Sequence, residues 1–111
     1  MIPRVYIDTS VIGGCLDEEF RAYSERLFTD FEANQLRAVI SNLTIAEILQ
    51  APKRVQALLQ RPAVQKAEKV YLDNEAILLA EAYIRERVVS DAHRVDAQHI
   101  AIATIQRVDI L

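Results

Sequence analysis

Short runs of β-branched and aromatic residues alternate with longer stretches of helical periodicity along this chain. Residues 5–7 and 36–40 are the first two runs, and each predicts a buried strand. Between them, over residues 18–33, apolar side chains recur at the three- and four-residue spacing of an amphipathic helix. These side chains are Phe20, Tyr23, Leu27, Phe28 and Phe31.

The second half of the chain repeats this alternation. Ser41 and Asn42 predict the start of a helix over residues 43–49, and Pro52 and Pro62 bracket another short helix. The further elements expected are a strand at 70–72, a helix at 75–89 capped by Asn74, a helix at 94–106 and a strand at 108–111. Strands that alternate with helices predict an α/β fold with a parallel sheet and helices on both of its faces.

Asp8 directly follows the first predicted strand. In open parallel sheets, ligands bind beyond the carboxyl ends of the strands, so an acid here is well placed to hold a metal ion or to act on a phosphate. The same acid could instead cap the next helix. Because Thr9 or Ser10 could cap that helix equally well, we expect Asp8 to have no structural role.

Glu47 lies inside the short, mostly apolar helix predicted after the second strand. A Glu that faces solvent on a helix needs no function. Here Ile45 and Ile48 flank it, so the segment is expected to be half buried, and Glu is rarely buried without a partner. The pattern therefore favours a metal or hydrogen-bonding role for Glu47.

Asp96 opens the last predicted helix, where the helix dipole favours an acid even without a function. Ala97, Ala101 and Ala103 keep this helix thin, so that it can lie close to the sheet and carry Asp96 toward one edge. His99 is one turn further on and could face the same way. A lone His among apolar residues is more often a hydrogen-bonded structural group than a ligand.

Taken together, these acids form an ordered set. Asp8 follows the first strand, Glu47 lies in the helix after the second, and Asp96 opens a late helix. Mg²⁺ takes oxygen ligands, so carboxylates from several elements suit it, and the ion in turn allows neighbouring carboxylates to stay charged. We expect the three to converge at one end of the sheet.

Composition narrows the function classes. The chain has 111 residues, of which 51% are hydrophobic, and this fits one compact domain. Its net charge of −3 argues against a strongly basic surface for nucleic acid, but not against an enzyme that reaches phosphates through a metal and a few arginines. Cys15 is the single cysteine, which excludes an intrachain disulfide. The start does not read as a signal peptide, and Glu81 interrupts the longest later apolar stretch, so we expect a cytoplasmic protein without membrane contact.

Three segments of the chain, at residues 5–10, 41–47 and 96–103, resemble the leading motifs of the PIN-domain family. Within that family the chain is most similar to the toxin ribonucleases of bacterial type II toxin–antitoxin pairs. The resemblance runs over essentially the whole chain, and the domain would span residues 1–111. It implies a Rossmann-like sheet of strand order 3-2-1-4-5 and endoribonuclease activity that depends on Mg²⁺ or Mn²⁺.

The resemblance also implies roles for individual residues. Asp8, Glu47 and Asp96 would be the catalytic, metal-binding acids, and Thr9 and Ser10 would be small polar residues that contact the substrate. The implied partners are an RNA substrate, a cognate antitoxin protein that blocks the site, and a second copy of the chain in a homodimer.

The chain departs from the family pattern at its end. The family usually continues after the fourth strand with a polar segment, often carrying a fourth acid or an Asn, and a fifth strand. This sequence ends at Leu111, and Asp109 is a poor match for the missing residue. We therefore expect a truncated C-terminal strand region, an exposed strand edge and weakened nuclease activity.

Two other functions remain open. The first is a PIN-fold binding module without catalysis, which metal-dependent cleavage by the purified chain would exclude. The second is a phosphotransfer enzyme with Asp8 as nucleophile. Such enzymes typically carry another Asp two residues later, where this chain has Ser10.

Overall fold

A computed structural model describes residues 1–110 of the chain. Its centre is a parallel sheet of three strands, β1 (Arg4–Tyr6), β2 (Arg37–Ser41) and β3 (Glu68–Val70), in the order β1-β2-β3. Val5 forms an isolated parallel bridge to Ile110 on the side of β1 away from β2. The segment predicted as a fourth strand thus reaches β1, as expected, and Leu111 lies outside the described residues.

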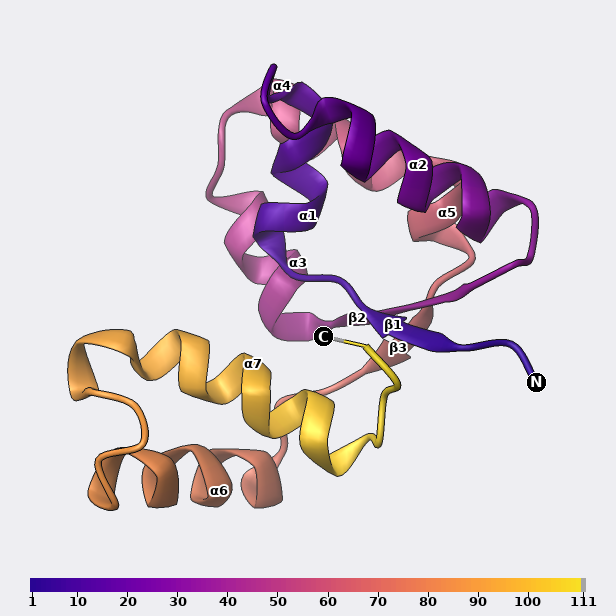
Figure 1. Cartoon of the computed structure of the whole chain (residues 1–111). Coiled ribbons are helices and arrows are strands. Elements are labelled where there is room, and N and C mark those ends of the chain that lie inside the picture. The colour runs from indigo at the N-terminus through magenta and orange to yellow at the C-terminus, as the bar shows by residue number, and fades with distance from the viewer. Residues whose placement is uncertain (111) are drawn as a thin grey trace.

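Helices connect the strands and cover both faces of the sheet (Figure 1). The α-helices within residues 1–110 are α1 (Thr9–Gly13), α2 (Arg21–Glu32), α3 (Asn42–Leu49), α4 (Lys53–Gln56), α5 (Pro62–Gln65), α6 (Asn74–Arg85) and α7 (Arg94–Ile105). Three short 3₁₀ helices join them: η1 (Gly14–Leu16), η2 (Ala57–Gln60) and η3 (Asp91–His93). The fold is therefore α/β, as predicted, and compatible with a Rossmann-like arrangement. Within residues 1–110, no helix is long and apolar enough to cross a bilayer.

Alternation along the strands separates two hydrophobic cores. Val5 and Ile7 pack with α1, α2 and α5, while Tyr6, between them, packs with α6 and α7. On β2, Ala38 and Ile40 face the first core and Val39 faces the second. Since successive side chains of a strand point to opposite faces, a strand buried on both faces reads as a continuous apolar run, which is why β1 and β2 were recognisable.

Helix α7 packs chiefly against α6, and together they cover one face of the sheet. Ala97 and Ala101 are fully buried, and Ala103 is nearly so. Since His99 contacts β1, Ala97 and Ala101 lie on the other side of α7, so they allow a close approach to α6 rather than to the sheet as predicted. On the facing helix α6, Ala76 and Ala80 are buried in the same core.

The prediction for α2 was wrong in two respects. The helix begins at Arg21 rather than at residue 18, and Phe20 and Tyr23 are 53% and 65% exposed. Ser24 is buried in their place, against Gly14, where an added Cβ would come within 2.3 Å of the Ser24 hydroxyl oxygen. Two small residues thus set how α2 approaches η1, and the large rings at 20 and 23 turn outward.

Two elements of the second half also differ from expectation. Strand β3 begins two residues earlier than predicted, since its pairing with β2 starts with Glu68 in register with Val39. The Glu68 carboxylate also pairs with the Arg4 guanidinium at 2.6 Å. Asp73, not Asn74, caps α6, accepting a hydrogen bond from the Ala76 N–H at 2.9 Å.

Helix α6 ends at Arg85 rather than at residue 89. Arg87 takes a left-handed conformation with φ 60°, and the Val88 N–H donates to the Tyr83 carbonyl. This is a common way to terminate a helix, usually with Gly or Asn at the left-handed position, and an Arg there gave no sequence signal.

Candidate functional site

Asp8 stands where β1 ends and α1 begins. It is the N-cap of α1, and its Oδ1 accepts a hydrogen bond from the Val11 N–H at 3.2 Å. Thr9 and Ser10 were equally good candidates for this cap by residue type, but both lie within the helix itself, so the prediction that Asp8 has no structural role was wrong. Asp8 therefore has a structural role, which occupies one of its two carboxylate oxygens.

Glu47 reaches the same edge of the sheet from α3. Ser41, the last residue of β2, caps that helix as predicted, accepting from the Thr44 N–H at 3.1 Å. The side chain of Glu47 is 34% exposed, which confirms the expected half-burial. Its Oε1 accepts a hydrogen bond from the Thr9 hydroxyl at 3.1 Å, so α1 and α3 are joined beside Asp8.

His99 of α7 is the second partner of Glu47. Its Nε2 lies 2.6 Å from Glu47 Oε1, and the residue is only 7% exposed. On its other side, His99 Nδ1 lies 2.5 Å from the Tyr6 hydroxyl, which is itself 2.7 Å from the Ser41 hydroxyl. A polar network thus crosses the α6/α7 core and ends on a carboxylate at the sheet edge.

The environment of Tyr6 links this network to the acids. Burial raises the pKa of the Tyr6 hydroxyl, hydrogen bonding to Ser41 lowers it, and the negative charges of Asp8 and Glu47 raise it further. Both carboxylates therefore lie within electrostatic reach of one buried phenol. Sequence reasoning missed Tyr6, Ser41 and Thr44 as members of the site. The available signal was a Tyr within a buried strand, since a buried Tyr hydroxyl needs a partner.

Asp96 lies in the first turn of α7. His99, in the first half of α7, contacts Tyr6 at the end of β1. The Gln106 carbonyl, just after α7, accepts a hydrogen bond from the Arg4 guanidinium at the start of β1. Helix α7 therefore runs antiparallel to β1. Asp96 consequently lies on the carboxyl-edge side, as expected. Its side chain is 70% exposed and contacts His93 Nδ1 at 3.2 Å, away from Glu47.

The structure thus brings the three predicted acids to one side of the sheet without joining them in a cluster. Among residues 1–110, no three His, Cys, Asp or Glu side chains are grouped closely enough to hold a metal ion. Asp8 and Glu47 are linked through Thr9, Ser10 is exposed, and Asp96 stands apart.

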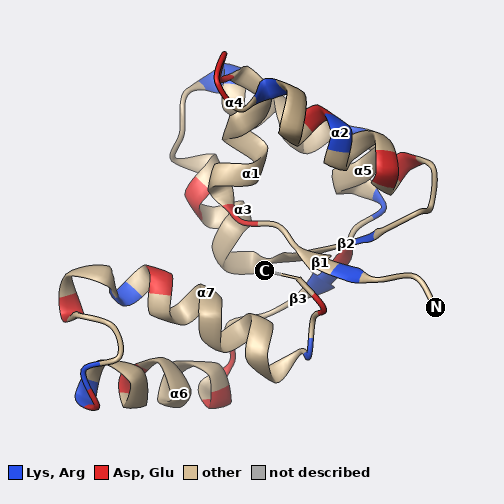
Figure 2. Cartoon of the chain, in the orientation of Figure 1, with Lys and Arg blue, Asp and Glu red and all other residues tan. Residues whose placement is uncertain are grey.

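Figure 2 shows Lys and Arg interspersed with Asp and Glu along the ribbon. The Arg94 guanidinium, near the start of α7, is paired with Glu81 of α6. The Arg61 guanidinium is held by Glu25 and Glu32 of α2 and lies 4.8 Å from the centre of the Phe28 ring. These arginines are engaged in ion pairs and do not form a basic patch beside the acids.

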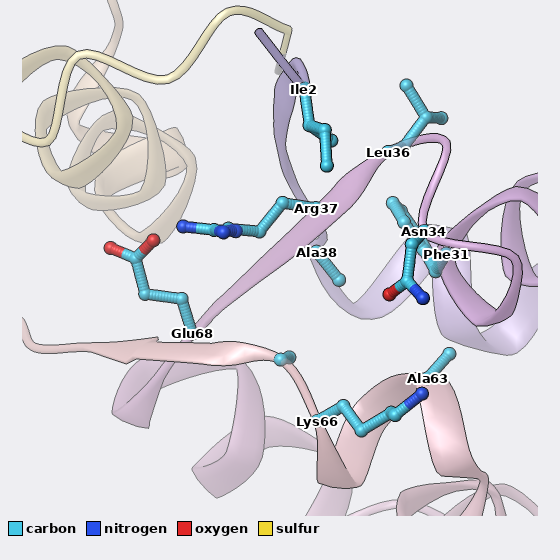
Figure 3. Close-up of a pocket in the computed structure, with 10 residues that line it drawn as sticks. Ile2, Phe31, Asn34, Leu36, Arg37, Ala38, Ala63, Lys66 and Glu68 are labelled. Atoms are coloured by element: carbon cyan, nitrogen blue, oxygen red, sulfur yellow. The ribbon is translucent and has the colours of Figure 1, made fainter.

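A cavity lies at the opposite edge of the sheet. It has a volume of about 370 Å³, and Figure 3 shows Ile2, Arg37 and Glu68 around it, at the starts of the strands. The remaining lining residues are Phe31, Asn34, Leu36, Ala38, Ala63, Lys66 and Ala67. Glu68 is its single acid and is bound to Arg4, so this cavity is separate from the predicted site.

Comparison of the chain with protein-family models and with curated proteins gives no match.

Proposed function

We propose that this chain is a Mg²⁺- or Mn²⁺-dependent endoribonuclease of the PIN type, acting as the toxin of a type II toxin–antitoxin pair in the cytoplasm. One observation carries the proposal. The hydroxyl of Thr9, the residue after Asp8, donates to Glu47 at 3.1 Å, so α1 after β1 and α3 after β2 place the two acids at the same carboxyl edge. This edge is where open parallel sheets bind their ligands.

The donor atoms at this edge suit a hard cation. Within residues 1–110, Asp8 Oδ2 and Glu47 Oε2 accept no hydrogen bond, so each acid keeps one oxygen for a ligand. Asp96 would be the third acid after turning away from His93. When bound, Mg²⁺ would supply charge to orient a phosphodiester and to offset the charge on the leaving oxygen.

Thr9 and Ser10 have different parts in this proposal. The Thr9 hydroxyl is engaged with Glu47 and helps to hold it. Ser10 is exposed on α1 and makes no side-chain hydrogen bond within residues 1–110, so its hydroxyl is the freer one to contact RNA.

The proposed protein partners are an antitoxin and a second copy of the chain. A shallow apolar cavity of about 210 Å³ adjoins Ser10 and is lined also by Val11, Phe20, Tyr23 and Ser24. The exposed rings of Phe20 and Tyr23 offer an apolar surface to a protein that would cover the site.

The test is RNA cleavage with and without Mg²⁺ by the wild type and by Asp8→Asn. Asn is as good an N-cap as Asp, so the substitution keeps the α1 cap and removes the charge. Asp73→Asn is the matched control, because Asp73 caps α6 in the same way. The proposal expects cleavage that EDTA and Asp8→Asn abolish and Asp73→Asn preserves. Equal cleavage by the two variants, from preparations free of contaminating nuclease, would contradict it.

A binding module without catalysis is the second candidate, favoured by the absence of a three-acid cluster in residues 1–110. In that case Asp8→Asn would leave RNA binding intact, and the wild type would bind RNA in Mg²⁺ without cutting it.

A further inference from the structure

We infer that His99 is a positioning residue for Glu47, held in one orientation and donating through Nε2 by its contact with Tyr6. The part of this inference that involves a metal ion rests on the proposed function. The role of His99 itself follows from the directions of the hydrogen bonds around Tyr6.

The hydroxyl protons of the network can be assigned one by one, starting from Thr44 and going on to Ser41 and Tyr6. The Thr44 hydroxyl donates to the Ile7 carbonyl at 3.2 Å, and a carbonyl can only accept. Thr44 has a single hydroxyl proton, so at its 3.3 Å contact with Ser41 it can only accept. The Ser41 hydroxyl is therefore free to donate either to Thr44 or to Tyr6.

At the other end, Glu47 fixes the proton on His99. An ionised carboxylate can only accept, so a separation of 2.6 Å requires a proton on His99 Nε2. A neutral imidazole with that proton has an accepting Nδ1, which Tyr6 fills by donating its hydroxyl proton. Ser41 then donates to Tyr6, and every atom of the network has a partner.

Nε2 carries the proton in either charge state of His99. If His99 is an imidazolium, its Nδ1 also carries a proton and donates it to the Tyr6 hydroxyl oxygen. The Tyr6 hydroxyl then donates to Ser41, and the Ser41 hydroxyl donates to Thr44. Only the hydroxyl protons reverse direction. The donor facing Glu47 is unchanged, so Tyr6 accommodates both forms of the ring without disturbing the carboxylate.

The hydrogen bond from His99 restricts the orientation of the Glu47 carboxylate. Its Oε1 receives two donors, the Thr9 hydroxyl and His99 Nε2, from helices on opposite faces of the sheet. Held from both sides, the carboxylate loses rotational freedom, and Oε2 becomes the oxygen left for a cation. Groups that orient a metal ligand in this way typically change metal affinity by about 10- to 100-fold when they are removed.

The first test determines the tautomer of His99 directly and does not depend on enzymatic activity. Nitrogen NMR of the wild type at pH 8 is expected to show His99 with a protonated Nε2 and an unprotonated Nδ1. Tyr6→Phe, which removes the donor to Nδ1, should let the ring sample both tautomers. Tyr71→Phe, an exposed control, should leave the His99 signals unchanged. A wild type protonated at Nδ1 alone, or mixed like free histidine, would overturn the inference.

The second test separates positioning from folding. Mn²⁺ affinity is measured for His99→Gln, which keeps an N–H donor toward Glu47, and for His99→Leu, which does not. We expect affinity to fall at least about tenfold in His99→Leu and to stay near wild type in His99→Gln, with both variants folded by circular dichroism. Equal affinities would overturn the positioning role. A wild type that neither binds Mn²⁺ nor cleaves RNA would refute the proposed function, and the tautomer alone would then decide this inference.

Discussion

On the α1/α2 face of the sheet, large side chains fill the space, whereas on the α6/α7 face small residues and a polar network do. Phe28 and Phe31 of α2 pack 6.2 Å apart at an interplanar angle of 51°. The other face holds buried alanines together with Tyr6 and His99, whose rings lie 5.6 Å apart. The two faces of one sheet are thus held in different ways, by packing of large apolar rings on one side and by a buried hydrogen-bond network among small residues on the other.

The polar network depends on His99 of α7, which reaches the strand residue Tyr6 and the carboxylate of Glu47 at the edge. The buried Ala97 and Ala101 lie on the other side of α7, where the helix packs closely against α6. On the ring-filled face, no side chain of α2 hydrogen-bonds to the strands within residues 1–110. The network face is therefore where the proposed site obtains its support.

The largest effect is expected on the ring-filled face. Phe28 is fully buried, so Phe28→Ala should lower the free energy of unfolding by about 3–5 kcal/mol through lost burial and a cavity. The control is Phe20→Ala, which removes a ring that is 53% exposed. It should change the free energy of unfolding by less than about 0.5–1 kcal/mol. Urea denaturation measures both. Similar losses for the two variants would remove the distinction between a buried and an exposed ring.

The buried thiol on the same face gives a pH dependence. Burial raises the pKa of Cys15 from 9.0 to about 11, with the charge of Glu25 adding to the effect. The pKa of the Cys15 thiol is higher in the folded than in the unfolded chain. The contribution of the protonated thiol to the free energy of unfolding is therefore fully present below pH 9 and is lost as the pH rises toward 11. The loss could reach about 2–3 kcal/mol. Cys15→Ala should flatten the stability profile between pH 8 and 10.5. A profile with the same slope in wild type and variant would show that Cys15 does not titrate this way.

The network face should respond to the loss of one hydroxyl. Tyr6→Phe removes one hydrogen-bond partner each from Ser41 and from His99 Nδ1, which leaves that ring nitrogen unpaired, and should lower the free energy of unfolding by about 1–3 kcal/mol. Tyr71→Phe, at an exposed Tyr, should have almost no effect in the same urea titration. If Tyr6→Phe is as stable as wild type, the network contributes no stability and the two faces differ only in side-chain size.

Much of the fold could be predicted because it depends on local pattern. The runs at β1 and β2, the Ser41 cap and the alanines of α7 each carry their own signal in sequence. The failures arose where distant residues decide. The start of β3 depends on its register with β2, where Glu68 pairs with Val39, and the outward turn of Phe20 and Tyr23 depends on where Gly14 meets α2.

The positions of Asp8 and Glu47 at the ends of strands could be predicted from the sequence, but their hydrogen-bond partners could not. Asp8 and Glu47 stand out because each follows a strand, and the strand ends meet at one edge. The bonds of Glu47 to Thr9 and His99 span 38 and 52 residues, and no spacing rule indicates them. Asp8 was misjudged because N-cap preference does not distinguish Asp from Thr or Ser at adjacent positions.

We propose that the carboxyl edge of this sheet binds a divalent cation. Paramagnetic Mn²⁺ broadens the NMR signals of nearby amides, so titrating substoichiometric Mn²⁺ into labelled protein compares the two edges in one measurement. The account predicts that the amides of Thr9, Glu47 and His99 broaden first, while those of Arg37 and Glu68 at the amino edge stay sharp. Broadening first at Arg37 and Glu68, or evenly over the whole chain, would contradict it.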